Sequence, residues 1–101
     1  MEKYDIRIYK AAKQDMLYIV DYYINMLSPQ ATIEQYERIV ERIGSLAEMP
    51  ERCHLLNNDN LRLKGYRVLR ADNYMIFFIV KGKVVQIRRI LYGKRNYEWL
   101  L

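Results

Sequence analysis

Cysteine and histidine are nearly missing from this chain of 101 residues, which has one of each. Cys53 has no second cysteine to pair with, so no disulfide forms within the chain, and we expect a reducing, cytoplasmic location. Its neighbour His54 does not complete a zinc site, because zinc takes three or four such ligands. Adjacent side chains in a loop rarely face each other as a catalytic Cys–His pair does. We therefore expect no metal and no cofactor.

Glycine and proline are also scarce, with four and two residues, and the glycines are scattered. This excludes a glycine-rich phosphate loop. No linker rich in Gly, Pro or Ser divides the chain, so we predict a single domain over residues 1–101. The longest apolar run, Tyr74–Val80, is far shorter than the roughly 20 residues of a membrane helix, and we expect no membrane contact.

Charge, by contrast, is plentiful and unevenly distributed along the chain. Residues 1–60 contain seven basic and ten acidic side chains, whereas residues 61–101 contain ten basic and two acidic ones. The first part therefore carries a net charge of −3 and the second +8, within a total of +5. Such an asymmetry indicates a polyanionic or acidic partner for the second part.

Hydrophobic spacing predicts the element order β-α-α-β-β-β. Alternation predicts a strand over residues 4–9, and spacings of three and four predict helices over residues 10–27 and 29–47, the second begun by Ser28 and Pro29. The expected buried stripes are Ala12, Met16, Ile19, Val20, Tyr23, Ile24 and Leu27, with Asp15 and Asp21 outside them, and then Ile33, Tyr36, Ile39, Val40, Ile43, Leu46 and Ala47. We predict a loop over residues 51–60, strands over residues 63–70, 74–80 and 84–92, and a short helix or turn over residues 96–101.

These elements predict a two-layer α+β domain, in which a helical hairpin packs on one face of a largely antiparallel sheet and the other face stays open. Alternation places Tyr74, Ile76, Phe78 and Val80 inward and Met75, Phe77 and Ile79 on the open face. The same region carries Arg62, Arg67, Arg70, Arg88 and Arg89, with Tyr66, Tyr92 and Tyr97 beside them. Arginine and tyrosine on a strand surface suit RNA or phosphate contact, and the alternatives are a solvated face or one paired with an acidic peptide.

Seven segments carry a resemblance to a known family in their order and spacing. They are Ala11–Asp15, Ile19–Ile24, Ser28–Ala31, Ile43–Arg52, Tyr66–Leu69, Asn73–Phe78 and Ile87–Tyr97. Over nearly its whole length the chain resembles the RelE/ParE superfamily of bacterial toxins from type II toxin–antitoxin systems. The resemblance implies a small cytoplasmic toxin that is encoded beside an acidic antitoxin and meets operator DNA only through that antitoxin.

The resemblance extends to two branches with different targets. RelE-like toxins cleave mRNA on the ribosome without metal, whereas ParE-like toxins act on DNA gyrase. At the position of a RelE-like arginine this chain has Met75, which cannot stabilise a pentacoordinate phosphate, and two lysine positions fall on Tyr66 and Val68. The ParE-like branch is therefore favoured. The alternatives are a ribosome-dependent endoribonuclease and a non-toxic relative that survives as the binding partner of its antitoxin.

The candidate site residues follow from the resemblance and from the predicted open face. For a nuclease they are Arg67, Arg70, Arg88, Arg95 and Tyr97. For a macromolecular target they are Tyr92, Lys94, Arg95 and Tyr97, because the segment Gly93–Arg95 keeps the family pattern. For the antitoxin they are Arg70, Met75, Phe77 and Arg88, because an acidic antitoxin covers basic and apolar groups together.

Overall fold

The computed structural model describes residues 3–93 and 96–101. Its elements are β1 (Asp5–Ile8), α1 (Lys10–Met26), α2 (Pro29–Ser45), the short helix η1 (Pro50–Arg52), α3 (Asp59–Leu63), β2 (Tyr66–Ala71), β3 (Tyr74–Lys81), β4 (Val84–Tyr92) and the short helix η2 (Tyr97–Trp99). The predicted order is confirmed. The helices η1 and α3 occupy the segment expected to be a loop, and β2 begins at Tyr66 instead of residue 63.

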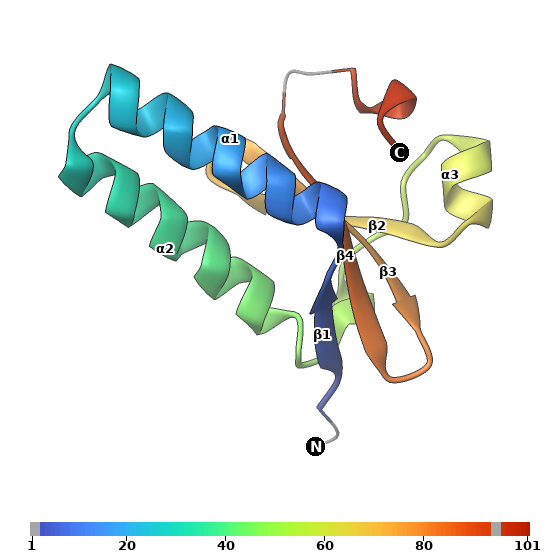
Figure 1. Ribbon diagram of the computed structural model, residues 1–101. Coiled ribbons are helices and arrows are strands. Elements are labelled where there is room, and N and C mark those ends of the chain that lie inside the picture. The colour runs from blue at the N-terminus through green and yellow to red at the C-terminus, as the bar shows by residue number, and fades with distance from the viewer. Residues whose placement is uncertain (1–2, 94–95) are drawn as a thin grey trace.

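The four strands form one sheet in the order β1-β4-β3-β2. Strand β1 runs parallel to β4, and the other neighbours are antiparallel. Figure 1 shows α1 and α2 side by side on one side of the sheet, with α3 and the C-terminal segment on the other. The predicted α+β fold, a helical hairpin on one face of a largely antiparallel sheet, is therefore confirmed.

The hairpin turns where the sequence predicts it. The Ser28 hydroxyl accepts a hydrogen bond from the Ala31 amide at 3.1 Å, and Pro29, which has no amide hydrogen to lose, begins α2. The predicted buried stripe of α2 is partly wrong, because Thr32, Gln35, Ile39 and Ile43 are buried whereas Ile33, Tyr36 and Val40 are 45–51% exposed. The reason is that Gln35 faces the sheet, where its amide nitrogen donates to the Asp72 carboxylate at 3.4 Å.

Helix α1 deviates from the prediction in the same way. Asp15, which was expected outside the buried stripe, is buried between Ala12 and Ile19, whereas Ile24 and Leu27 near the end of the helix are more than half exposed. The buried stripe of α1 therefore includes a carboxylate.

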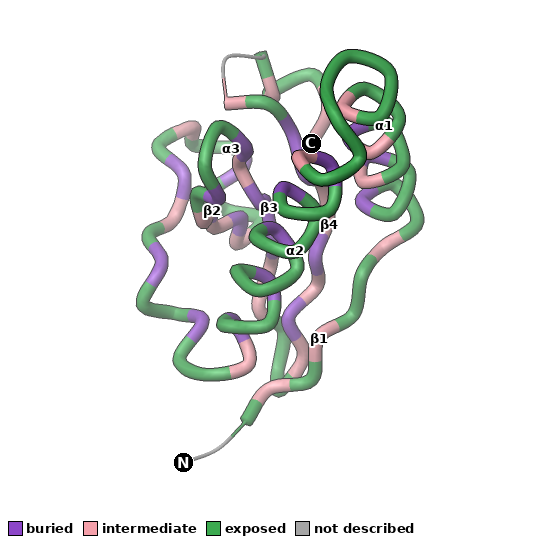
Figure 2. Tube along the Cα trace, turned by 90° about the vertical axis from the view of Figure 1, so that its left-hand side faces the viewer, coloured by how far each residue is buried: buried purple, intermediate pink, exposed green. Residues whose placement is uncertain are grey.

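The sheet carries a core on each face. On the hairpin face the core includes Ala12, Ile39, Leu46, Ile76, Phe78, Val85 and Ile87. On the other face Leu56, Leu61, Tyr66, Val68, Phe77 and Leu91 form a second, smaller core, against which Tyr97, Leu100 and Leu101 pack. Figure 2 shows that the buried residues gather on the strands, whereas much of the outer surface of the helices is exposed.

The predicted open face is therefore wrong over its centre. The alternation of β3 is confirmed, since Phe77 points away from the hairpin, but Phe77 is fully buried by the second core. Exposing an apolar sheet face to water costs about 25 cal/mol for each Å² of apolar surface. The short elements α3 and η2 cover the centre of this face and so remove it from water. Among the described residues of this face, Arg70 is exposed and Met75 and Ile79, on either side of Phe77 in β3, are half-buried.

Candidate functional site

One end of the sheet is shaped by the β2–β3 turn and by the residue that follows β4. The Gly93 amide donates to the Asn73 carbonyl at 2.8 Å. A Cβ atom at Gly93 would lie only 3.2 Å from that carbonyl oxygen, 3.5 Å from Met75 Cγ and 3.8 Å from an Arg70 guanidinium nitrogen. The absence of a side chain at Gly93 thus lets the end of β4 approach the turn. We call Arg70, Met75 and Gly93 the turn-end surface.

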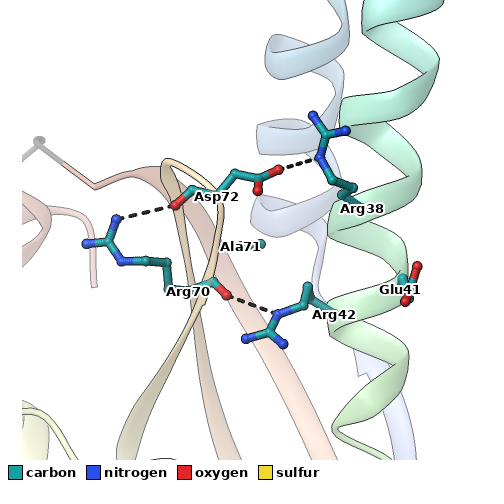
Figure 3. A pocket seen from close by; sticks show the side chains of 6 residues that line it. All are labelled: Arg38, Glu41, Arg42, Arg70, Ala71 and Asp72. Atoms are coloured by element: carbon teal, nitrogen blue, oxygen red, sulfur yellow. Dashed lines mark hydrogen bonds and ion pairs between the residues drawn. The ribbon is translucent and has the colours of Figure 1, made fainter.

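A pocket of about 540 Å³ borders this surface between α2 and β2. Its lining residues are Arg38, Glu41, Arg42, Arg70, Ala71 and Asp72. Figure 3 shows how they are connected: Arg38 pairs with the Asp72 carboxylate, Arg42 donates to the Arg70 carbonyl and Arg70 donates to the Asp72 carbonyl. The hydrogen bond that Arg38 donates to the Asp72 carboxylate raises the pKa of Arg38. With three arginines and two carboxylates, the pocket is net positive and suits an acidic side chain.

A groove lined by tyrosines lies on the hairpin side of the same turn. Its lining residues are Tyr22, Tyr23, Leu27, Asn73, Tyr74 and Tyr92. Tyr92 is 41% exposed and packs edge-on against Tyr74, with ring centroids 5.8 Å apart. Burial raises the pKa of Tyr74, so this phenol stays neutral. The tyrosine groove and the turn-end surface meet at Asn73, which joins an aromatic surface to a basic one.

Several arginines predicted on the open face have structural roles instead. Arg67 donates to the carbonyls of Cys53 and Glu51, which ties β2 to the segment around η1. Arg62 lies in α3 rather than on a strand and donates to the Leu56 carbonyl at 3.1 Å. Backbone carbonyls near these strands lack ladder partners, and the guanidinium groups satisfy them. Arg67 is therefore a poor candidate for catalysis.

Arg89 forms a buried ion pair that the sequence did not reveal. Its Nε and Nη2 atoms lie 2.7 and 2.8 Å from the two carboxylate oxygens of Asp15, and its Nη1 donates to the Leu100 carbonyl at 3.1 Å. Asp15 also accepts from the Ile90 amide at 2.9 Å. The hydrogen bond with Asp15 raises the pKa of Arg89. The local sequence signal for a buried Asp15 was its spacing, three residues after Ala12 and four before Ile19, which places it on the same helix face as these two buried residues.

Arg88 lies near the middle of β4, three residues before Leu91, which is in register with Met75. A β-bulge makes Phe77 pair with Arg89 and Phe78 with Ile87, so Arg88 is the extra residue of β4. Its guanidinium lies over the rings of Tyr9 and Tyr66, at 4.7 and 5.8 Å from their centroids. Tyr66 and Arg70 are four residues apart on β2, which corresponds to roughly 13 Å.

The candidate nuclease residues are thus not brought together within the part of the chain that the structure describes. Arg67, Arg70 and Arg88 lie apart, and Tyr97 packs against Phe77 with ring centroids 4.8 Å apart. The predicted antitoxin contact at Phe77 is wrong, because this ring is fully buried. Arg70 and Met75 adjoin each other as cross-strand neighbours, whereas Arg88 is not paired with either of them. Lys94 and Arg95 lie outside the described residues.

Metal-binding groups and helices of membrane-spanning length are both absent from the described residues. Among residues 3–93 and 96–101, no group of three His, Cys, Asp or Glu side chains is placed to hold a metal ion. No helix in this described part has the length and apolar character to span a bilayer. Cys53 is buried, and burial raises the pKa of its thiol. A neutral, buried thiol is a weak nucleophile.

Comparison with known families places the chain among toxins of the RelE/ParE type. The family described as ParE toxin of type II toxin-antitoxin system, parDE, matches residues 6–97, so the chain belongs to the ParE toxin family. No curated protein sequence matches the chain.

Two solved structures share the fold. One is the chromosomal ParDE toxin–antitoxin system from P. aeruginosa, with a TM-score of 0.77 and 23% identity, covering 91% of this chain and 98% of that one. The other is the toxin–antitoxin complex RelBE2 from Mycobacterium tuberculosis, with a TM-score of 0.63 and 20% identity, covering 89% and 98% of the two chains.

Proposed function

We propose that this ParE-family chain inhibits bacterial growth by binding DNA gyrase, and that an acidic antitoxin neutralises it. The observation that carries the proposal is the junction at Asn73, where the tyrosine groove meets the basic turn-end surface. Aromatic and arginine side chains are the residue types that dominate the energetics of protein interfaces. The arrangement supports binding more than bond cleavage.

The ribonuclease alternative is disfavoured by the same geometry. Phosphate cleavage needs several cations and a proton donor or acceptor around one scissile bond. Here Met75 occupies the turn-end surface, Arg67 donates to backbone carbonyls, and the Arg88 guanidinium lies over the ring of Tyr66, four residues from Arg70 on β2. The nuclease candidates therefore do not converge on one substrate atom.

The antitoxin is proposed to bind where positive charge and apolar surface coincide. Arg70 is exposed beside the half-buried Met75, and Tyr92 is accessible across the turn. An acidic segment laid over these groups satisfies the charge of Arg70 and covers the apolar side chains together. In the sequence, the basic residues Lys94 and Arg95 follow Gly93 directly.

The proposal is tested by expressing the chain without its antitoxin. We expect growth arrest, and we expect the purified chain to inhibit supercoiling of plasmid DNA by gyrase. If expression leads to mRNA cut at codon positions while supercoiling stays normal, the gyrase target is wrong and the ribonuclease alternative is correct. If growth continues at full expression, the chain is a non-toxic relative.

Arg95→Ala is predicted to reduce toxicity, because Arg95 belongs to the segment Gly93–Arg95, which keeps the family pattern. Loss of one charged contact in an interface is worth about 1.4 kcal/mol or more, so about tenfold more protein should be needed for the same arrest. The control is Lys13→Ala, an exposed position on α1 far from this segment in sequence. Growth curves at matched protein levels measure the effect, and equal toxicity of the two variants contradicts the assignment.

A further inference from the structure

A second basic pocket lies at the end of the sheet opposite to the turn-end surface. It has a volume of about 570 Å³ and is lined by Leu63, Lys64, Gly65, Tyr66, Ile79, Val80, Lys81, Gln86, Arg88 and Leu101. We call it the Arg88 pocket. Its lining comes from the end of α3, the start of β2, the β3–β4 hairpin and the last residue of the sequence.

The guanidinium of Arg88 is held in place within this pocket. Arg88 is the extra residue of the β-bulge. Its Cζ atom lies over two aromatic rings, 4.7 Å from the centroid of Tyr9 and 5.8 Å from that of Tyr66. Its Nη1 atom also donates to the side-chain oxygen of Gln86 at 3.2 Å. Because the group is already ordered, it loses little conformational entropy when it binds a partner. The guanidinium has five N–H donors in all, which leaves donors for an anion.

The surroundings of Arg88 combine positive charge with apolar surface. Lys64 and Lys81 are exposed at the pocket, and none of the described lining residues has a carboxylate side chain to balance the three cations. Leu63 is 86% exposed, and the half-buried Ile79 lies in the same lining. A cationic wall beside exposed leucine is complementary to a segment that carries a carboxylate next to an apolar side chain.

We infer that the Arg88 pocket binds a carboxylate side chain from an acidic polypeptide that also carries apolar residues. The inference rests on the proposed function insofar as the antitoxin is the partner expected to supply such a segment. A nucleic acid fits less well, because single-stranded bases stack on accessible aromatic rings and Tyr66 is only 3% exposed. The pocket thereby adds a second anchoring point, separate from Arg70 and Met75.

The test uses a random copolymer of L-glutamate and L-leucine as the probe, titrated into the full chain at 150 mM salt (about physiological ionic strength). We expect amide chemical shifts to change over residues 64–66, 79–81 and 86–88. Arg88→Gln should weaken binding about tenfold, as expected when one partner of a charged hydrogen-bonded pair is removed. Leu63→Ser should weaken binding of the copolymer but not of poly-L-glutamate, because only the apolar contact is lost.

The control is Lys13→Gln, which removes one positive charge from an exposed position on α1, on the hairpin side of the sheet. If Lys13→Gln and Arg88→Gln weaken binding equally, the copolymer is attracted by net charge alone, and the proposed pocket is wrong. A decathymidylate that binds the same amides in an Arg88-dependent way, while the copolymer does not, overturns it in favour of nucleic acid. If Arg88→Gln unfolds, the double variant Lys64→Gln/Lys81→Gln, at two exposed positions, replaces it. Growth arrest and gyrase inhibition are measured without the copolymer. A failure of the proposed toxin function is therefore distinguished from a failure of the Arg88 pocket to bind.

Discussion

At the scale of single residues, the ion pair between Asp15 and Arg89 connects three parts of the chain. Asp15 belongs to α1, Arg89 to β4, and the Leu100 carbonyl that accepts from Arg89 belongs to the C-terminal segment. The side chains of Asp15 and Arg89 are only 7% and 21% exposed. Asp15 also satisfies the Ile90 amide at a part of β4 that extends beyond its pairing with β1. The carboxylate thus replaces a missing strand partner.

Asp15→Ala is predicted to destabilise the fold by about 3–5 kcal/mol, because it leaves the Arg89 guanidinium poorly solvated and unpaired. The control is Asp21→Ala, also on α1, where the aspartate is exposed and bonds only locally with Asn25; we expect a change within about 0.5 kcal/mol. Denaturant unfolding measures both.

The double variant Asp15→Leu/Arg89→Met extends this test. Replacing both charges of a buried pair by apolar groups avoids an uncompensated charge, so it should recover much of the loss caused by Asp15→Ala. A single variant Asp15→Ala as stable as Asp21→Ala would contradict a structural role for the pair.

At the scale of elements, two short segments decide which surfaces a partner can reach. Helix α3 and the C-terminal segment cover the centre of the second sheet face, where Phe77 is fully buried against Tyr97. Asn58 caps α3 by accepting from the Leu61 amide at 3.0 Å, which places Leu61 in the second core. The two basic ends of the face stay accessible on either side of this cover.

Tyr97→Ala is predicted to destabilise the fold by about 1–3 kcal/mol, from the apolar area and the aromatic pair that are lost. It should also increase binding of a hydrophobic dye, because the ring of Phe77 becomes accessible. Trp99→Ala is the control, since this side chain is 86% exposed and its removal should change stability by about 0.5 kcal/mol or less. Equal effects of the two variants would show that Tyr97 does not protect the second core.

The strands and the helical hairpin were predictable from the sequence because their signals are local. The alternation along β3 predicts a strand from a few neighbouring residues, and Ser28 and Pro29 predict the start of α2 in the same local way. The cover of Phe77 was not predictable, since a five-residue helix and a short 3₁₀ turn have little intrinsic stability and form only where they pack. For the same reason the sequence indicated that Arg70 and Met75 lie on neighbouring strands, but it did not reveal that Phe77 is buried.

At the scale of the whole molecule, both cores depend on one sheet. Ile76 and Phe78 face the hairpin, whereas Phe77 faces the second core, so unfolding of β3 disrupts both faces at once. The molecule is thus expected to unfold in one transition. Among the described side chains, only Arg89 hydrogen-bonds both to α1 and to the C-terminal segment. The link through Arg89 decides whether this segment belongs to the same cooperative unit.

Arg89→Lys is predicted to separate the C-terminal segment from this unit. A lysine keeps the positive charge beside Asp15, but a single ammonium does not reproduce the fork that reaches both Asp15 and the Leu100 carbonyl. In the unaltered chain, Trp99 fluorescence anisotropy and far-UV circular dichroism should change at the same denaturant concentration. In Arg89→Lys the anisotropy should fall first, because the segment detaches while the hairpin-side core persists. Coincident transitions in the variant, as in the control Asp21→Ala, would show that apolar packing by Tyr97 and Leu100 suffices to hold the segment.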